Sequence, residues 1–169
     1  MADTFLLAEC NIERELLIHL GFSFKTDIEK ANGKADVMTR MKCNYRNRLA
    51  IGLVDEDPNK IKSKDYARFS RLFDPAYKMH FKKDPNANHF LIEFYDEFEP
   101  WILEINKKAK VEASRFLRET PTPRRLHEMN QSPKISNNYL KFYWEIVKQY
   151  PAPFNQIKEW IKRAQEGRL

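Results

Sequence analysis

The sequence predicts an α/β fold in which a mostly parallel sheet is flanked by helices. Residues 49–54 form a short apolar run of strand-forming residues, which is typical of a buried parallel strand. Residues 4–8 form a second compact apolar run, and residues 11–21 have the apolar spacing of a helix. Strand-like and helical segments therefore alternate from the start of the chain, as they do in α/β domains.

The run over residues 49–54 ends in a cluster of carboxylates. Asp55, Glu56 and Asp57 follow it, and Pro58 ends the strand because proline has no N–H group for the ladder. Residues two apart in a strand point to the same side, so we expect Asp55 and Asp57 to project together and Glu56 to face away. Two adjacent like charges are stabilised by sharing a cation such as Mg²⁺. The alternative is a solvated acidic turn.

The first apolar run also ends at a carboxylate, Glu9. The next segment predicts a helix with Asn11 as its N-cap and Gly21 as its stop. Glu9 therefore falls at the carboxyl edge of the sheet, where open α/β sheets bind ligands. Glu13 lies one helical turn further and can face the same edge, or it can simply complement the helix dipole.

Later segments continue the alternation. We expect a short strand within residues 22–28, a helix over 34–41, an edge strand over 77–83 and a further strand over 89–95. Pro100 favours a helix that begins there, with Glu99 at its amino end. Glu99 is either a further metal ligand or part of ordinary helix-start chemistry. Glu93 either faces solvent or contacts the metal ligands without binding the metal itself. His80 and His89 are interpreted as surface or core histidines.

The spacing of these carboxylates resembles that of a known family. An acidic residue after strand one, a helix, and a hydrophobic strand ending in Asp-x-Asp 46 positions later resemble the TOPRIM domain of topoisomerases, bacterial primases, ribosomal-RNA-maturing ribonucleases and OLD-type nucleases. Glu9-x-x-x-Glu13 followed by Asp55-x-Asp57 is most similar to the OLD branch and its small stand-alone relatives. The resemblance covers residues 4–105. The family usually has glycine after the first glutamate, where this chain has Cys10.

The resemblance implies a Mg²⁺- or Mn²⁺-dependent nuclease that cleaves phosphodiester bonds. OLD-type enzymes carry an ATPase module, and this sequence has no Gly-x-x-x-x-Gly-Lys-Ser/Thr motif, so the analogy implies a separate ATPase subunit, in a phage-defence setting. The alternative is a catalytically inactive TOPRIM-like subunit that docks a partner protein or nucleic acid, and Cys10 favours it. The implied catalytic residues are Glu9, Asp55, Asp57 and Lys134, and the implied metal ligands are Glu9, Glu13, Asp55, Asp57 and Glu99.

Basic residues suggest an anionic partner such as nucleic acid. The chain has a net charge of +6, and residues 106–134 contain eight basic and three acidic residues, a net charge of +5. We therefore predict a TOPRIM-like catalytic domain over residues 1–105 and a basic, helical extension over 106–169. The basic residues between 106 and 134 would also suit docking to an acidic protein surface. The candidate nucleic-acid contacts are Lys60, Lys62, Lys64, Lys107, Lys108, Arg124 and Arg125.

Other features argue against membrane and secreted classes. No stretch approaches the ~18 apolar residues of a membrane span, and the amino terminus lacks the basic and apolar regions of a secretory signal. Cys10 and Cys43 are expected to be free thiols in a reducing compartment. We therefore expect a cytoplasmic protein with no membrane contact. The sequence leaves the oligomeric state open.

Overall fold

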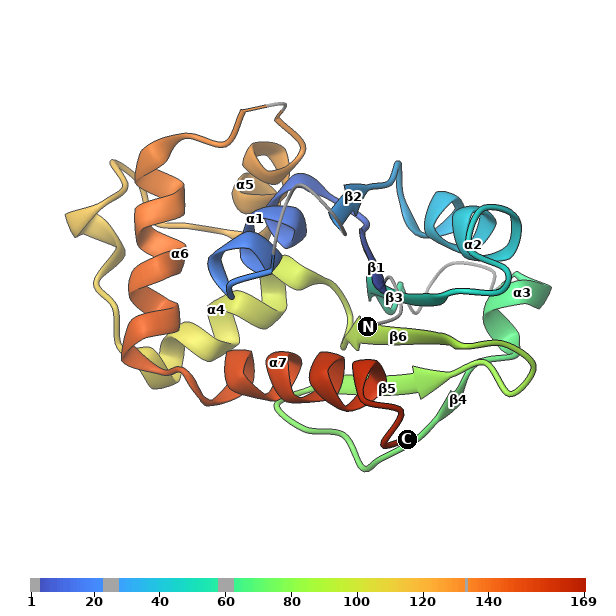
Figure 1. The fold of residues 1–169 in the computed structure, drawn as a ribbon. Helices are drawn as coiled ribbons and strands as arrows, with labels where there is room; N and C mark the ends of the chain where they lie inside the picture. Colours follow the sequence, from blue (N-terminus) through green and yellow to red (C-terminus); the bar gives the residue numbers. More distant parts are fainter. Residues whose placement is uncertain (1–3, 23–27, 58–62, 133) are drawn as a thin grey trace.

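A six-stranded mixed sheet forms the centre of the computed structural model, which describes residues 4–22, 28–57, 63–132 and 134–169 (Figure 1). The strand order is β2-β1-β3-β6-β5-β4. The four strands β2, β1, β3 and β6 run parallel, whereas β5 and β4 are antiparallel to their neighbours. The predicted α/β class with a mostly parallel sheet is therefore confirmed. The strands are β1 (Thr4–Ala8), β2 (Ile28–Lys30), β3 (Leu49–Asp55), β4 (Ser70–Arg71), β5 (Met79–Lys83) and β6 (His89–Phe94).

Helices cover both faces of this sheet. Residues of α1, α4, α6 and α7 share one hydrophobic core with one face, and residues of α2 and α3 share a smaller core with the other. Figure 1 shows the two groups apart, with α7 lying along β5. The helices are α1 (Asn11–His19), α2 (Lys34–Cys43), α3 (Lys64–Ala67), α4 (Phe98–Ala109), α5 (Pro123–Asn130), α6 (Asn137–Gln149) and α7 (Ala152–Gln165), and Ala113–Arg115 forms a single 3₁₀ turn.

The alternation of side chains along β3 explains why this strand is apolar throughout. Leu49, Ile51 and Leu53 belong to the larger core, and Ala50 and Val54 belong to the smaller one. Because both faces are covered by helices, successive residues all need apolar side chains. Asp55 is the last residue of this strand and the first that is polar.

Gly52 in the middle of β3 lies where the backbone of the strand approaches α2. A Cβ atom at this position would lie 2.7 Å from Val37 Cγ1 and 3.0 Å from Met41 Cε. We expect Gly52→Ala to lower the free energy of unfolding by about 1–3 kcal/mol, because extra atoms in a packed core force neighbouring side chains to move. Urea denaturation measures this change. Adding Val37→Ala should recover part of the loss, and an unchanged midpoint in the single variant would contradict the packing described.

Several element boundaries differ from the prediction. The segment predicted as an edge strand is β5, and the two-residue strand β4 covers its outer side. The N-cap of α1 is Cys10, while the Asn11 side chain donates a hydrogen bond to the Ser132 carbonyl at 2.8 Å. Helix α4 begins at Phe98, so Pro100 is its third residue. The strand predicted within 22–28 falls partly on residues 23–27, outside the described residues, and β2 begins at Ile28.

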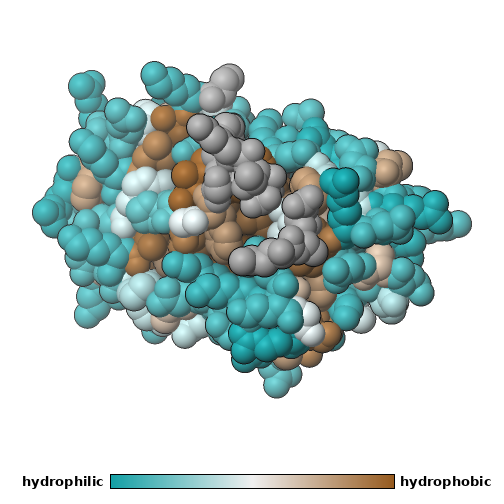
Figure 2. Space-filling view, viewed as in Figure 1, coloured by the Kyte–Doolittle hydropathy of each residue, from teal (hydrophilic) through white to brown (hydrophobic). Residues whose placement is uncertain are grey.

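The C-terminal helices pack against the sheet. The Trp160 ring of α7 stacks on the Phe81 ring of β5 with centroids 5.2 Å apart. The boundary that we predict between residues 105 and 106 lies inside α4. In Figure 2, apolar side chains gather over α1 and α6. The His19 ring of α1 stacks on the Trp144 ring of α6 with ring centroids 4.1 Å apart. Among the described residues, none of the helices combines the length and apolar character needed to cross a membrane.

Candidate metal centre

Four of the predicted carboxylates line one cavity at the carboxyl edge of the parallel strands. Glu9 follows β1, Asp55 ends β3, Asp57 lies two residues beyond it, and Glu99 lies in the first turn of α4, after β6. The cavity has a volume of about 440 Å³. Because parallel strands end at the same edge, residues far apart in the sequence meet here.

Glu9 and Asp55 are fixed by backbone donors. The Asp55 N–H donates to Glu9 Oε2 at 3.0 Å, which ties the end of β1 to the end of β3. The Phe98 N–H, at the start of α4, donates to Asp55 Oδ1 at 2.8 Å. A carboxylate offers about four lone-pair sites, so these bonds leave acceptor capacity for a cation.

The position of Asp57 does not follow from the alternation of side chains along a strand, because Asp57 lies beyond the end of β3. The strand ends at Asp55, and Asp57 adopts a left-handed backbone conformation with φ +48°. Its N–H donates to the Asp96 carbonyl at 3.1 Å, and its Oδ2 lies 3.8 Å from Lys34 Nζ. The turn geometry therefore positions Asp57 beside the other carboxylates.

Glu99 is held by α5, where the sequence indicated the nucleic-acid contacts Arg124 and Arg125 but no residue of a metal site. Its Oε1 accepts a hydrogen bond from Asn130 Nδ2 at 2.9 Å, and Asn130 Oδ1 accepts one from the Tyr143 hydroxyl at 2.9 Å. His127 Nδ1 lies 3.3 Å from the same Glu99 oxygen, and His127 lines the cavity. His127 and Asn130 lie three residues apart on one helix face, so both side chains reach Glu99, but this spacing occurs throughout every helix and does not single them out in the sequence.

Glu13 lies beneath the site and is fully buried. Its Oε2 accepts a hydrogen bond from the Cys10 N–H at 2.9 Å, whereas Oε1 has no hydrogen-bond partner among the described residues. Burial, together with the charges of Asp55 and Glu9, raises the pKa of Glu13 well above its usual range. A buried carboxyl group with an unpartnered oxygen is costly in its charged form.

The whole cluster has a deficit of positive charge. Burial first, and then the charges of Glu9 and Glu99, raise the pKa of Asp55 to about 8. Burial also raises the pKa of Glu9; the charge of Asp57 adds to this rise, and hydrogen bonds from backbone N–H groups oppose it. Crowded carboxyl groups with raised pKa values are stabilised by a divalent cation, and oxygen donors suit Mg²⁺ or Mn²⁺. The carboxylates of Glu9, Asp55, Asp57 and Glu99 offer oxygen donors of this type, but no three of them bring ligand atoms within 4.8 Å of one another in the described residues.

The raised pKa of Asp55 gives a prediction for the metal-free protein. In the folded chain Asp55 keeps its proton up to about pH 8, whereas in the unfolded chain it releases the proton near pH ~4. Its contribution to stability is therefore full below about pH 4 and is lost as the pH rises toward about 8, at most about 1.4 kcal/mol per pH unit. Urea unfolding with a chelator should show stability falling over this range, with a shallower fall in Asp55→Asn. Stability that rises with pH in the wild type, or an unchanged slope in the variant, would contradict this charge crowding.

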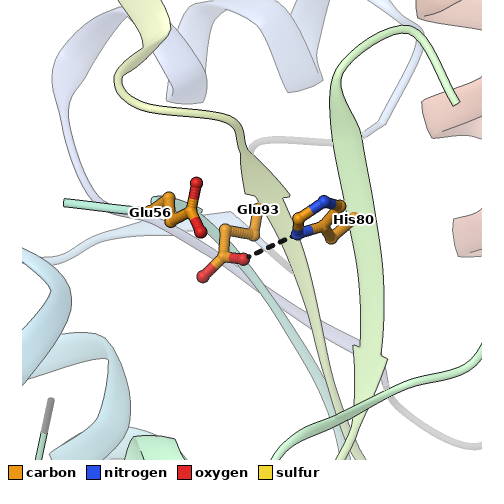
Figure 3. A group of neighbouring side chains, drawn as sticks. All are labelled: Glu56, His80 and Glu93. Atoms are coloured by element: carbon orange, nitrogen blue, oxygen red, sulfur yellow. Dashed lines mark hydrogen bonds and ion pairs between the residues drawn. The ribbon is translucent and has the colours of Figure 1, made fainter. Parts of the chain in front are cut away.

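A second group of possible ligands lies on the face of the sheet that is covered by α2 and α3. Glu56, His80 and Glu93 place one ligand atom each within 4.8 Å of one another, which Glu9, Asp55 and Asp57 do not do in the described part of the chain. Figure 3 shows Glu93 between the other two side chains, with its carboxylate toward His80. Glu93 is fully buried, which excludes the first of the two alternatives given for it, that it faces solvent.

Glu93 already has positive and hydrogen-bonding partners. Lys82 Nζ lies 2.5 Å from its Oε2, His80 Nδ1 lies 3.2 Å from the same oxygen, and the Tyr66 hydroxyl donates to Oε1. Arg71 lies 3.4 Å from His80 Nε2 and can only donate, so Nε2 is the acceptor and the proton sits on Nδ1. A metal would need a deprotonated Nδ1 and would face the Lys82 ammonium. The arrangement therefore favours a buried ion-pair network over a metal site.

The predicted nucleic-acid contacts are spread over the surface. Lys60 and Lys62 lie outside the described residues, and Lys64, Lys107 and Lys108 are exposed. Arg124 pairs with Glu128, and Arg125 pairs with Glu119 and Glu128. Lys134 is exposed and is not among the described residues that line the carboxylate cavity. Among the described residues, Lys30 and Lys34 border the carboxylates, and neither was predicted from the sequence.

Comparisons with known proteins do not add an assignment: no family model, curated protein or solved structure matches this chain. The functional argument therefore rests on the geometry of the site.

Proposed function

We propose that this chain is a TOPRIM-type, metal-dependent nuclease that resembles the OLD branch and hydrolyses phosphodiester bonds. The observation that carries the proposal is the convergence of Glu9, Asp55, Asp57 and Glu99 on one cavity at the carboxyl edge of the sheet. The position of Glu9 after β1 and of Asp55-x-Asp57 at the end of β3 agrees with the resemblance in the sequence. The net charge of +6 is consistent with a polyanionic substrate.

In this proposal the carboxylates hold one or two Mg²⁺ or Mn²⁺ ions, which supply Lewis-acid activation of the phosphate and of water when bound. The backbone donors of Asp55 and Phe98 keep Glu9 and Asp55 in place, so little reorganisation of these side chains is needed. Asn130 orients Glu99. His127 lines the same cavity, with its Nδ1 3.3 Å from Glu99 Oε1.

The test is a cleavage assay on plasmid DNA, linear DNA and RNA with Mg²⁺, with Mn²⁺ and with a chelator. We expect cleavage that requires a divalent ion and stops when the chelator is added. The same assay identifies whether DNA or RNA is the substrate. The resemblance to OLD-type enzymes implies a separate ATPase subunit, in a phage-defence setting, so the assay should be repeated with a candidate ATPase partner.

A second candidate is a non-catalytic binding subunit, and Cys10 favours it. Cys10 lines the carboxylate cavity where the TOPRIM family usually has glycine, so its side chain occupies space near an approaching phosphate. This candidate predicts binding of nucleic acid or a partner protein without cleavage, with or without the ATPase. Cys10→Gly would then be expected to leave the chain inactive, whereas in a nuclease it should retain or increase the cleavage rate.

A further inference from the structure

Two cavities meet at the carboxyl edge of the sheet. The carboxylate cavity extends toward α4 and α5, and a second cavity of about 290 Å³ lies between the start of α2 and Tyr66. Tyr66, Ser63 and Met38 line only the second cavity. The two form one trough, because four residues line both of them: Glu9, Asn32, Gly33 and Asp57.

Lys34 lies in this trough beside the shared residues. It is the first residue of α2, and its side chain is 16% exposed. Its Nζ donates to the Glu56 carbonyl at 2.8 Å and lies 3.8 Å from Asp57 Oδ2. The same atom lies 4.7 Å from the centroid of the Tyr66 ring, a cation–π contact. These contacts hold the ammonium group next to a carboxylate that is proposed to bind metal.

The ammonium retains capacity to bind an anion. It carries three N–H donors, and the Glu56 carbonyl is its one partner at hydrogen-bond distance among the described residues. The distance of 3.8 Å to Asp57 is longer than a charge-assisted hydrogen bond, which is about 2.7–2.9 Å. A phosphate oxygen that enters the trough can therefore accept a hydrogen bond from Lys34 without breaking its bond to Glu56.

We propose that Lys34 is a phosphate-binding residue of the proposed nuclease, and that its ammonium contacts a non-bridging oxygen of the phosphodiester held at the carboxylates. This inference rests on the proposed function and deepens it. A substrate phosphate brings further negative charge to a group of carboxylates, so a cation other than the metal stabilises the complex and the charge that develops during hydrolysis. Lys134, predicted for this role from the sequence, is exposed and lies outside the residues lining the trough.

A purely structural role for Lys34 makes a different prediction. In that case its bond to the Glu56 carbonyl only fastens α2 to the end of β3. Removing the ammonium would then lower the stability of the fold, while cleavage and nucleic-acid binding by the folded protein would stay the same. Activity and binding must therefore be measured beside urea unfolding.

The experiment compares Lys34→Met, Lys34→Arg and the control Lys42→Met. Lys42 lies on the same helix, in an exposed ion pair with Asp65, so its variant removes the same charge away from the trough. Cleavage kinetics are measured with Mg²⁺. Binding of fluorescein-labelled DNA and RNA oligonucleotides is measured with Ca²⁺, to separate binding from turnover. We expect Lys34→Met to lower kcat/KM by about 10²-fold, the effect of losing one preorganised donor, and to weaken oligonucleotide binding. Lys34→Arg should recover part of both losses, and Lys42→Met should resemble the wild type.

The outcomes separate this inference from the proposed function. If the wild type cleaves and Lys34→Met, correctly folded, cleaves and binds equally well, Lys34 does not bind phosphate although the nuclease assignment stands. If the wild type binds oligonucleotide without cleaving it, the nuclease assignment fails; selective loss of binding in Lys34→Met would still support the phosphate contact. If the wild type neither binds nor cleaves, both are overturned.

Discussion

Asp55→Asn is expected to lower the rate of Mg²⁺-dependent phosphodiester cleavage by at least about 10³-fold. The metal supplies several kcal/mol of transition-state stabilisation, and each ~1.4 kcal/mol corresponds to a tenfold change in rate. Asparagine keeps an oxygen that can accept the Phe98 N–H bond, so the start of α4 should stay in place. The loss would then report on the negative charge of Asp55. Single-turnover cleavage of the preferred substrate measures it.

The same substitution should increase stability when no metal is present. Burial and neighbouring carboxylates raise the pKa of Asp55 to about 8, so its charged form is unfavourable in the folded chain at high pH. A neutral side chain removes that cost, which is the usual trade-off between stability and activity at a functional site. Asp65→Asn is the control, because Asp65 lies in an exposed ion pair away from the cavity. Equal activity of Asp55→Asn and the wild type would remove Asp55 from the mechanism.

Lys82→Met is expected to lower the free energy of unfolding by about 3–5 kcal/mol, the cost of leaving a buried charge without its partner. Lys82 Nζ lies 2.5 Å from Glu93 Oε2, and Glu93 is fully buried between β5 and β3. Tyr66 and His80 also contact Glu93, and the Lys82 ammonium supplies the ion pair. Urea denaturation at pH 7 measures the loss.

Two further variants separate the ion pair from general effects of substitution. The double variant Lys82→Met/Glu93→Gln should be more stable than Lys82→Met alone, because it removes the unpaired charge. Lys42→Met breaks an exposed pair and should change stability by about 0–1 kcal/mol. A loss of similar size in Lys82→Met and Lys42→Met would show that the buried network contributes little.

Most of the fold could be predicted because its signals are local. The continuous apolar run of β3 follows from burial on both faces, and the helical spacing in α2, α6 and α7 follows from one apolar face. The edge position of β4 could not be predicted, since a two-residue strand has too few residues to show a period. The predicted N-cap of α1 lies one residue too late, because Cys10 is not a typical capping residue, whereas Asn11 is.

Part of the site could be predicted for a similar reason. Glu9 and Asp55 lie directly at strand ends, and the topology of parallel strands brings such residues to one edge. His127, Asn130 and Lys34 could not be predicted in the same way. The first two reach Glu99 from α5, more than twenty residues further along the chain, and Lys34 reaches Asp57 from the start of α2. Such contacts depend on tertiary packing, which a single sequence does not show.

The most direct test of the central claim is a calorimetric titration of the wild-type protein and Asp55→Asn with Mn²⁺ near pH 8. The account predicts that the wild type binds Mn²⁺ and that the folded variant binds it at least about tenfold more weakly, because one charged ligand has been lost. Absence of Mn²⁺ binding by the folded wild type, or equal binding by both proteins, would contradict a metal centre formed by the carboxylates at the ends of β1 and β3.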